Sequence, residues 1–469
     1  MPAQRLAMEA LRTLLLSRPF PLPQIAGESL SHLKGFYASQ ASAPLWVGPT
    51  GLGPKGRTLL TRLRIVAAAG APALGPLLTE AENRVLASSG QPLAELELLL
   101  SAAFLEAAID PNDPAATART PAGLLQAAES PIILLSLRNY LPADPAFWRL
   151  RGAIMSYRLL EAGGGWPVIP PGPKLELGAI GPTVESLRRR LLTTGDLIEP
   201  SPKPNEFDIA LHAAVSHFQA RHGLQVDGVV GKNTLEALNM PIAARIDTLE
   251  LNLRRLQRQQ REWGQRYVVV NTAAASYRLI DGGQQLFERV AIVGRRDWPT
   301  PQLDGVIDRL EFNPYWVVPS RIARLEVLPK IRRDPDYMAA NDFHWVDGQI
   351  RQDPGPKNPL GKVKFLFPNP YDVYLHDTNS HKLFDRWDRH LSHGCMRIPN
   401  ALDLAMYLLK DDPRWPPQRI DDILQSGQVV RVTLSAPIPV HVVYDTAWVD
   451  DAGIVNFRRD IYGRDDFAE

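Results

Sequence analysis

Cysteine is almost absent from this sequence. Cys395 is the only cysteine among 469 residues, so the chain can form no intrachain disulfide and no zinc or iron–sulfur site built from several cysteines. A lone thiol is either a small buried apolar side chain or a reactive group. The interpretation of the protein depends on which of the two Cys395 is.

An excess of charge of one sign is also missing. The 52 Lys+Arg and 51 Asp+Glu residues leave a formal net charge of +1. This near balance argues against a general nucleic-acid binder or a protein of anionic membrane surfaces, because both need a strong basic excess.

Long apolar runs are missing as well. The longest, residues 65–79, is interrupted by two glycines and two prolines and is too short to span a bilayer. The first 20 residues place Glu9 inside a short leucine-rich stub, so they are not predicted to form a competent signal peptide.

Proline, in contrast, is abundant, with 42 residues against a usual share of about 5%. Together with the periodicity, the breaks predict an α+β multidomain protein. Its expected parts are a helical N-terminal scaffold (25–160), a linker (163–174), a compact three-helix unit (178–241), a connecting amphipathic helix (242–265) and a β-rich domain (266–469).

The connecting helix and the β-rich domain have the clearest patterns. The helix is expected to bury an apolar stripe and to present Arg254, Arg255, Arg258 and Arg261 to solvent. Strands are predicted at residues 267–271, 277–280, 287–293, 306–312, 371–375, 429–433, 440–443 and 454–458. Helices are predicted at residues 320–332, 401–409 and 418–425.

The chemistry-bearing segment surrounds Cys395. The thiol follows Ser392, His393 and Gly394 and precedes Arg397, a polar and flexible run that suits a reactive site better than a core. A thiol needs a lowered pKa or an adjacent base to attack a carbonyl at neutral pH. Imidazole is the natural base.

His376, at the end of the predicted strand 371–375, supplies such an imidazole. Gly394 lets the backbone approach closely, so its amide and that of Cys395 are candidates for an oxyanion hole. The structural alternative, an inert core cysteine, stays open at this point.

These residues resemble a known signature. His376, the run Ser392-His393-Gly394-Cys395 and Arg397 are similar to the catalytic motif of the YkuD-type L,D-transpeptidases. The surrounding segments, residues 300–301, 313–319, 356–361 and 365–378, resemble the larger YcbB-like branch of that family.

The resemblance implies roles for single residues. Cys395 is the expected nucleophile and His376 its general base. Asp377 is expected to orient the imidazole through its backbone carbonyl, with no role assigned to its carboxylate. His393 and Gly394 complete the expected catalytic set, His393 either acting directly or tuning the thiolate through local hydrogen bonds.

The resemblance also implies a substrate-binding set. Arg397 is expected to hold a substrate carboxylate, with Tyr374, Ser392 and Trp316 lining the site. Tyr374 has the alternative of being a sheet aromatic. The insertion at about residues 313–362 resembles a capping segment that excludes water, in which Trp345 is expected to pack structurally.

The three-helix unit resembles a small peptidoglycan-binding module. The matching residues are Phe218-Gln219, His222-Gly223-Leu224, the run Val226 to Gly231, and Thr234. Whether this copy binds glycan or only acts as a scaffold is left open.

The leading hypothesis is thus an enzyme that cross-links the third residues of peptidoglycan stem peptides through a cysteine acyl-enzyme and releases terminal D-alanine. The resemblance implies no metal or organic cofactor, covalent inhibition by carbapenem-type β-lactams, and a periplasmic or wall-facing location despite the weak N-terminus. No nucleic acid or transmembrane segment is expected.

Three alternatives remain. The same acyl-enzyme can serve an L,D-carboxypeptidase or D-amino-acid exchange, according to the acceptor. A zinc D,D-peptidase would use the histidines His376, His381, His390 and His393, although their spacing matches no zinc pattern. A non-catalytic wall-binding protein would not require the His376/Cys395 pair.

Overall fold

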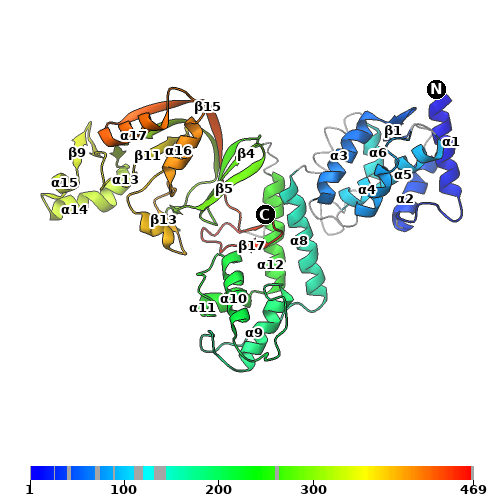
Figure 1. Ribbon diagram of the computed structural model, residues 1–469, viewed down its shortest axis with the longest axis horizontal. Helices are drawn as coiled ribbons and strands as arrows, with labels where there is room; N and C mark the ends of the chain where they lie inside the picture. Colours follow the sequence, from blue (N-terminus) through cyan, green and yellow to red (C-terminus); the bar gives the residue numbers. More distant parts are fainter. Residues whose placement is uncertain are drawn as a thin grey trace. The chain divides into compact units, whose positions relative to one another are not determined.

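The structure is a computed structural model that describes residues 2–25, 27–39, 44–68, 74–87, 90–109, 120–130, 144–258 and 263–465. The chain divides into two compact units. The first consists of residues 1–159 together with 449–453, and the second of residues 160–448 and 454–469. Each unit is described by itself, with the elements labelled as in Figure 1.

The first unit is mainly helical. Its elements are α1 (Pro2–Leu16), α2 (Gly27–Ser39), β1 (Val47–Gly48), β2 (Gly51–Leu52), α3 (Pro54–Ala68), α4 (Leu74–Glu82), α5 (Gly90–Ala108), α6 (Pro121–Glu129) and the first part of α8 (Pro145–Ala162). The predicted buried helix at residues 96–108 is confirmed: in α5, a run that is apolar nearly all round is buried on nearly all sides. The predicted break at residues 111–114 lies outside the described residues.

The second unit begins with the three-helix module. Its helices are α9 (Pro182–Thr193), α10 (Ile209–Arg221) and α11 (Lys232–Leu238). The Gln219 side chain joins them to the turn: its oxygen accepts the N–H groups of Asp227 and Gly228 at 3.0 and 2.8 Å, and its amide donates to the carbonyl of Val229 and the hydroxyl of Thr234. The sequence motif of this module therefore marks contacts that hold its fold.

The segment predicted as a linker, residues 163–174, has no helix or strand but is fixed to the module. Trp166 donates its indole N–H to the carbonyl of Met240 at 3.1 Å. The Asn239 side chain makes two hydrogen bonds with the backbone of Ile169, which is fully buried. The segment is consequently part of the module's packing.

The amphipathic helix is α12 (Ile242–Arg258), which ends earlier than predicted; residues 259–262, with Arg261, lie outside the described residues. The expectation of a solvated arginine face is wrong for Arg255. Its guanidinium lies 2.9 Å from Asp465 and donates to the carbonyl of Tyr444. Only the tertiary fold brings the C-terminal segment to this helix.

The β-rich domain contains an eight-stranded sheet in the order β14-β12-β11-β7-β15-β3-β4-β5. The strands are β3 (Tyr267–Asn271), β4 (Ser276–Asp281), β5 (Gln284–Val290), β7 (Leu303–Phe312), β11 (Val363–Leu366), β12 (Leu375–His376), β14 (Met396–Arg397) and β15 (Val430–Val443). Two pairs, β12 with β14 and β15 with β3, are parallel, and the others are antiparallel. A short parallel pair, β6 (Val293–Gly294) and β13 (His390–Ser392), lies outside this sheet.

Two helices cover this sheet, α16 (Ala401–Leu409) and α17 (Pro417–Ser426), as Figure 1 shows. Leu404 of α16 and Ile420 of α17 enter the same core as Val270, Leu310 and Phe365 of the strands. Alternating burial along the strands puts one face of the sheet against this core. The opposite face is thus available for polar side chains.

The predicted strands 429–433 and 440–443 form one strand, β15. Its pairing with β7 shifts register between Thr433 and Ile438. Pro437 and Pro439 lie at this irregularity, where the missing N–H groups of proline are tolerated. The sequence pattern predicts the two halves of β15 separately. Their union into one strand depends on the pairing with β7 and β3.

The predicted strand at residues 371–375 is wrong for most of its length, because only Leu375 belongs to β12. Asp372 has a positive φ of 53°. The Asn369 side chain holds a turn here by accepting the N–H of Tyr371 at 3.0 Å and donating to the carbonyl of Val373 at 2.8 Å. The turn brings the chain into β12.

The predicted capping insertion contains a small subdomain with its own core. The strands β8 (Trp316–Val317), β9 (Phe343–Val346) and β10 (Gln349–Gln352) form a three-stranded sheet, and α13 (Ser320–Ile322), a π-helical turn (Ala323–Val327), α14 (Leu328–Arg333) and α15 (Tyr337–Ala340) pack beside it. Short π-helical turns often occur at functional sites.

The remaining strands are β16 (Ala447–Val449) and β17 (Val455–Phe457), which pair with each other. Phe457 stacks on His222 of the three-helix module at 5.4 Å. In the parts of the chain that the structure describes, no helix has the length and apolarity to cross a membrane. The predicted fold class, an α+β multidomain chain with a helical N-terminal part and a β-rich C-terminal domain, is confirmed.

Candidate active site

The pairing of β12 with β14 places four predicted site residues on one face of the sheet. His376 is opposite Arg397 and Leu375 is opposite Met396 in a parallel register. Leu375 and Met396 are fully buried in the core, so their neighbours Tyr374, His376, Cys395 and Arg397 face the other way. Cys395 and His376 are thereby diagonal neighbours across two adjacent strands.

Burial follows the same alternation through residues 391–399, which we call the nucleophile loop after the expected role of Cys395. Ser392, Gly394, Met396 and Ile398 are buried, whereas the odd-numbered residues between them, including Cys395, are partly exposed. Cys395 as a residue is partly exposed and follows polar residues in the chain, as expected for a reactive cysteine. This placement favours a reactive thiol over an inert core cysteine.

His376 is held in one orientation. It is only 3% exposed, and its Nδ1 lies 2.5 Å from the backbone carbonyl of Asp377. Because a carbonyl only accepts, Nδ1 carries the proton and Nε2 keeps its lone pair. The Asp377 carboxylate is engaged elsewhere, since it accepts the N–H of Lys362 at 2.8 Å.

The electrostatics of the site favour a neutral imidazole. Burial, with the positive charges of Arg397 and Lys364, lowers the pKa of His376 to about 3. Burial raises the pKa of the Cys395 thiol, while the backbone N–H and hydroxyl of Tyr374 and the charges of Lys364 and Arg397 act in the opposite direction. At neutral pH, the His376 imidazole is therefore uncharged.

This low pKa predicts acid-sensitive stability. Because the unfolded chain protonates histidine near pH 6.5, it binds more protons than the folded chain as pH falls toward 3, and stability is lost over that window. Between pH 7 and pH 4.5, we expect His376→Gln to lose less stability than the natural chain, by about 2 to 3 kcal/mol.

Hydrogen exchange of β11 and β12, corrected for the intrinsic rates at each pH, measures the difference. His381→Gln is the control, since its side chain is 62% exposed. Equal acid sensitivity in His376→Gln and the natural chain would contradict the prediction.

Arg397 has free hydrogen-bonding capacity. Among the described residues, its Nε is buried without a hydrogen-bond partner. A guanidinium with unused donors beside a nucleophile is suited to a carboxylate ligand. This observation supports the expected contact with a substrate carboxylate.

The expected contribution of Gly394 to an oxyanion hole needs correction. Its N–H donates to the Ser392 hydroxyl at 3.1 Å, and that hydroxyl donates to the carbonyl of Cys395 at 2.6 Å. Ser392 is buried in the loop and so does not line the substrate site. Gly394 instead permits a φ of +113°, which a residue with a side chain rarely adopts.

His393 points toward the capping subdomain. Its Nε2 lies 2.6 Å from Glu326 in the π-helical turn, and the Trp298 ring meets it edge to face at 4.7 Å. These contacts are the local hydrogen bonding that was expected as the alternative to a direct catalytic role. The contact joins the nucleophile loop to the capping subdomain.

Neither tryptophan of the capping subdomain is placed as expected. Trp316, expected at the substrate, packs with Phe343 in the small core of the subdomain. Trp345, expected to pack structurally, is 58% exposed.

Two supporting residues were given no role by the sequence analysis, although Thr300 belongs to the segments that carry the resemblance. Thr300 is fully buried, donates its hydroxyl to the carbonyl of Gly394 at 2.8 Å and accepts the N–H of Gly294 at 2.9 Å. Lys364 lies in β11 directly opposite His376. Lys364 could have been found in the sequence, because it is the one charged residue in the apolar run Val363–Phe367.

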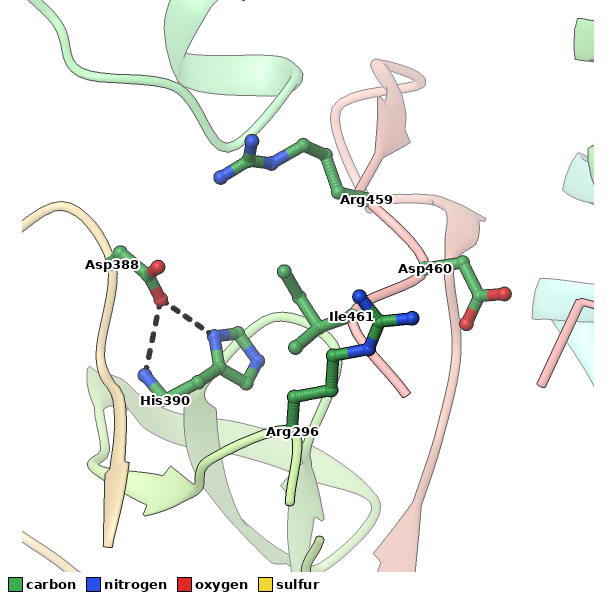
Figure 2. Close-up of a pocket in the computed structure, with 6 residues that line it drawn as sticks. All are labelled: Arg296, Asp388, His390, Arg459, Asp460 and Ile461. Atoms are coloured by element: carbon green, nitrogen blue, oxygen red, sulfur yellow. Dashed lines mark hydrogen bonds and ion pairs between the residues drawn. The ribbon is translucent and has the colours of Figure 1, made fainter. Parts of the chain in front are cut away.

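A separate cavity of about 390 Å³ lies beside β13 (Figure 2). Its lining residues are Arg296, Asp388, His390, Arg459, Asp460 and Ile461. His390 Nδ1 lies 2.9 Å from Asp388, and Nε2 lies 2.9 Å from the carbonyl of Thr272. The cavity lining includes neither Cys395 nor His376, and the histidine fixes the start of the strand that leads to Ser392.

The histidines of the zinc alternative have different partners: the carbonyl of Asp377 for His376, the carboxylate of Asp377 for His381, and Asp388 and Glu326 for His390 and His393. Within the described residues, no three His, Cys, Asp or Glu side chains are grouped to hold a metal ion.

Three family models match the chain. Residues 265–420 match the L,D-transpeptidase catalytic domain of the YkuD family, residues 180–238 match a "Putative peptidoglycan binding domain", and residues 31–154 match a scaffold domain.

A similar curated protein is the "Putative L,D-transpeptidase" of Haemophilus influenzae, which is 31% identical over 219 residues. The match covers 42% of this chain and 44% of that protein, so the chain spans less than half the length of this relative.

Solved structures that the comparison matches include an L,D-transpeptidase from Stackebrandtia nassauensis, with 15% identity over 58% of this chain and 95% of that one and a TM-score of 0.25. Another is an L,D-transpeptidase from Mycobacterium smegmatis, with 14% identity over 38% and 58% and a TM-score of 0.22. The resemblance found in the sequence is confirmed by the family matches: the chain carries a YkuD-type L,D-transpeptidase catalytic domain together with a peptidoglycan-binding domain.

Proposed function

We propose that this protein is a cysteine-dependent L,D-transpeptidase that joins the third residues of two peptidoglycan stem peptides. The observation that carries the proposal is the common face of β12 and β14, on which Cys395, His376 and Arg397 lie together. The catalytic-domain match supports the reaction class. Peptidoglycan as substrate implies a wall-facing location.

The geometry supports a two-step acyl transfer. The thiol of Cys395 attacks the amide carbonyl after the third stem residue, and Nε2 of His376 accepts the thiol proton. The C–N bond breaks, the proton passes to the nitrogen of the departing D-alanine, and a thioester remains. Arg397 binds a carboxylate of the donor stem.

The second step consumes the thioester. The side-chain amine of a second stem attacks its carbonyl, the C–S bond breaks, and Cys395 regains a proton by way of His376. The capping subdomain, linked to the nucleophile loop through Glu326 and His393, excludes water during this step. Water or a free D-amino acid in place of the amine would give hydrolysis or exchange.

The test is incubation of the full chain with disaccharide-tetrapeptide, followed by mass spectrometry. We expect a dimer linked between third residues and release of one D-alanine per link, and no product from Cys395→Ala. A tripeptide product alone would assign a carboxypeptidase. Product from Cys395→Ala would overturn the cysteine mechanism.

Acylation by a carbapenem tests independently whether Cys395 is the nucleophile. We expect a single covalent adduct, located by peptide mapping on Cys395, because the β-lactam carbonyl takes the place of the stem amide. An adduct on another residue would contradict the assignment of the nucleophile.

A further inference from the structure

A row of charged and polar residues crosses the sheet and ends at the candidate active site. The register aligns Arg431 of β15 with Glu311 of β7, Glu311 with Lys364 of β11, Lys364 with His376 of β12, and His376 with Arg397 of β14. Directly paired residues share a face of the sheet. This cross-strand row therefore lies on the same face as Cys395.

Within the row, the ammonium of Lys364 is directed at the catalytic end. Its Nζ lies 3.8 Å from the centre of the Tyr374 ring, and that ring meets His376 at 5.6 Å. A cation over an aromatic face is attracted by the ring quadrupole. The Tyr374 ring thus fixes a positive charge next to the imidazole and the sulfur.

Glu311 neutralises the charge of the Lys364 ammonium only in part, because its carboxylate is already paired with Arg431. It is 6% exposed and forms an ion pair of 2.7 Å with Arg431, on the side away from Lys364. Burial lowers the pKa of Lys364, while the charges of Glu311 and of the Cys395 sulfur raise it. A partly buried ammonium that interacts with the sulfur is also positioned to stabilise the thiolate.

We propose that Lys364 is a positioning residue that stabilises the anionic sulfur of Cys395 and, with Arg397, keeps the His376 imidazole unprotonated until the thiol transfers its proton. The proposal rests on the proposed function only in assigning Cys395 as the nucleophile. The S–H bond breaks, the proton moves to Nε2 of His376, and the electron pair stays on sulfur, facing the ammonium.

Alkylation by iodoacetamide tests this without any peptidoglycan. Since the chain has one cysteine, peptide mapping of the alkylated full chain separates Cys395 from the amines that also react at high pH, and the rate at Cys395 from pH 5 to pH 10 follows the thiolate. We expect the midpoint for Lys364→Met to rise by about one pH unit, a tenfold slower reaction below the midpoint. Lys364→Arg should keep the midpoint of the natural chain.

Two further variants separate charge from packing. Glu311→Gln removes a negative charge from the same row, so the midpoint should fall, opposite to the effect of Lys364→Met. Lys362→Met, two positions earlier at an exposed site, is the matched control and should leave the midpoint unchanged.

An unchanged midpoint in Lys364→Met, or shifts of the same sign for Lys364→Met and Glu311→Gln, would overturn the proposal. Because alkylation needs no stem peptide, a failure of the transpeptidase assay with normal alkylation profiles would count against the proposed function alone.

Discussion

Replacing His376 by alanine should slow acylation of Cys395 by a carbapenem about 10²- to 10⁴-fold at pH 7, the usual contribution of a positioned general base. The physical reason is the fixed tautomer: Nδ1 donates to the carbonyl of Asp377, which leaves Nε2 to accept the thiol proton. Alanine has no acceptor, and burial keeps the thiol protonated. The adduct formed over time, followed by intact mass, gives the rate.

The pH dependence of this variant identifies the lost group as a base. Raising the pH should restore much of the rate in His376→Ala, because hydroxide then produces the thiolate that the imidazole no longer generates. His381→Ala is the control, since this histidine is largely exposed. A rate for His376→Ala equal to that of the natural chain at pH 7 would exclude His376 as the base.

The second large effect is expected in the N-terminal unit, at a residue that sequence analysis did not single out. Glu97 of α5 is fully buried. Its Oε1 accepts from the Tyr37 hydroxyl and the Leu45 N–H, both at 2.6 Å, and its Oε2 accepts from the N–H groups of Trp46 and Val47 at 3.0 Å. One carboxylate thus satisfies four donors.

Glu97→Ala should lower the stability of this unit by about 3 to 5 kcal/mol, because buried donors lose their acceptor. Glu97→Gln should be intermediate, since its amide turns two donor hydrogens toward other donors. Hydrogen exchange of α5 measures both effects.

Glu106→Ala is the matched control, an exposed glutamate on the same helix, and should change stability by less than about 0.5 kcal/mol. Equal stabilities of Glu97→Ala and Glu106→Ala would show that the carboxylate contributes nothing to the fold.

Local patterns were sufficient for much of the fold. The predicted strand at residues 267–271 and the predicted helix at residues 401–409 coincide with β3 and α16, because alternation and helical spacing are properties of consecutive residues. The motif around Cys395 likewise pointed to the catalytic domain through its resemblance to the YkuD-type signature, which the family match at residues 265–420 supports.

Predictions from local sequence patterns failed where hydrogen bonds or ion pairs with other residues determine the structure. Residues 371–374 alternate like a strand, yet the Asn369 side chain holds them in a turn. The Gly394 amide was expected to be free, yet the Ser392 hydroxyl occupies it. Arg255 was expected in solvent, yet Asp465 pairs with it.

The sequence by itself determined the class of fold, the catalytic domain and the identity of the expected nucleophile and base. Only the tertiary structure decided which side chains share a face with Cys395, because the register of β11, β12 and β14 brings Lys364, His376 and Arg397 into one row. A register error of one residue would turn all three side chains toward the core. No property of a single segment contains that information, since register depends on the packing of the whole sheet.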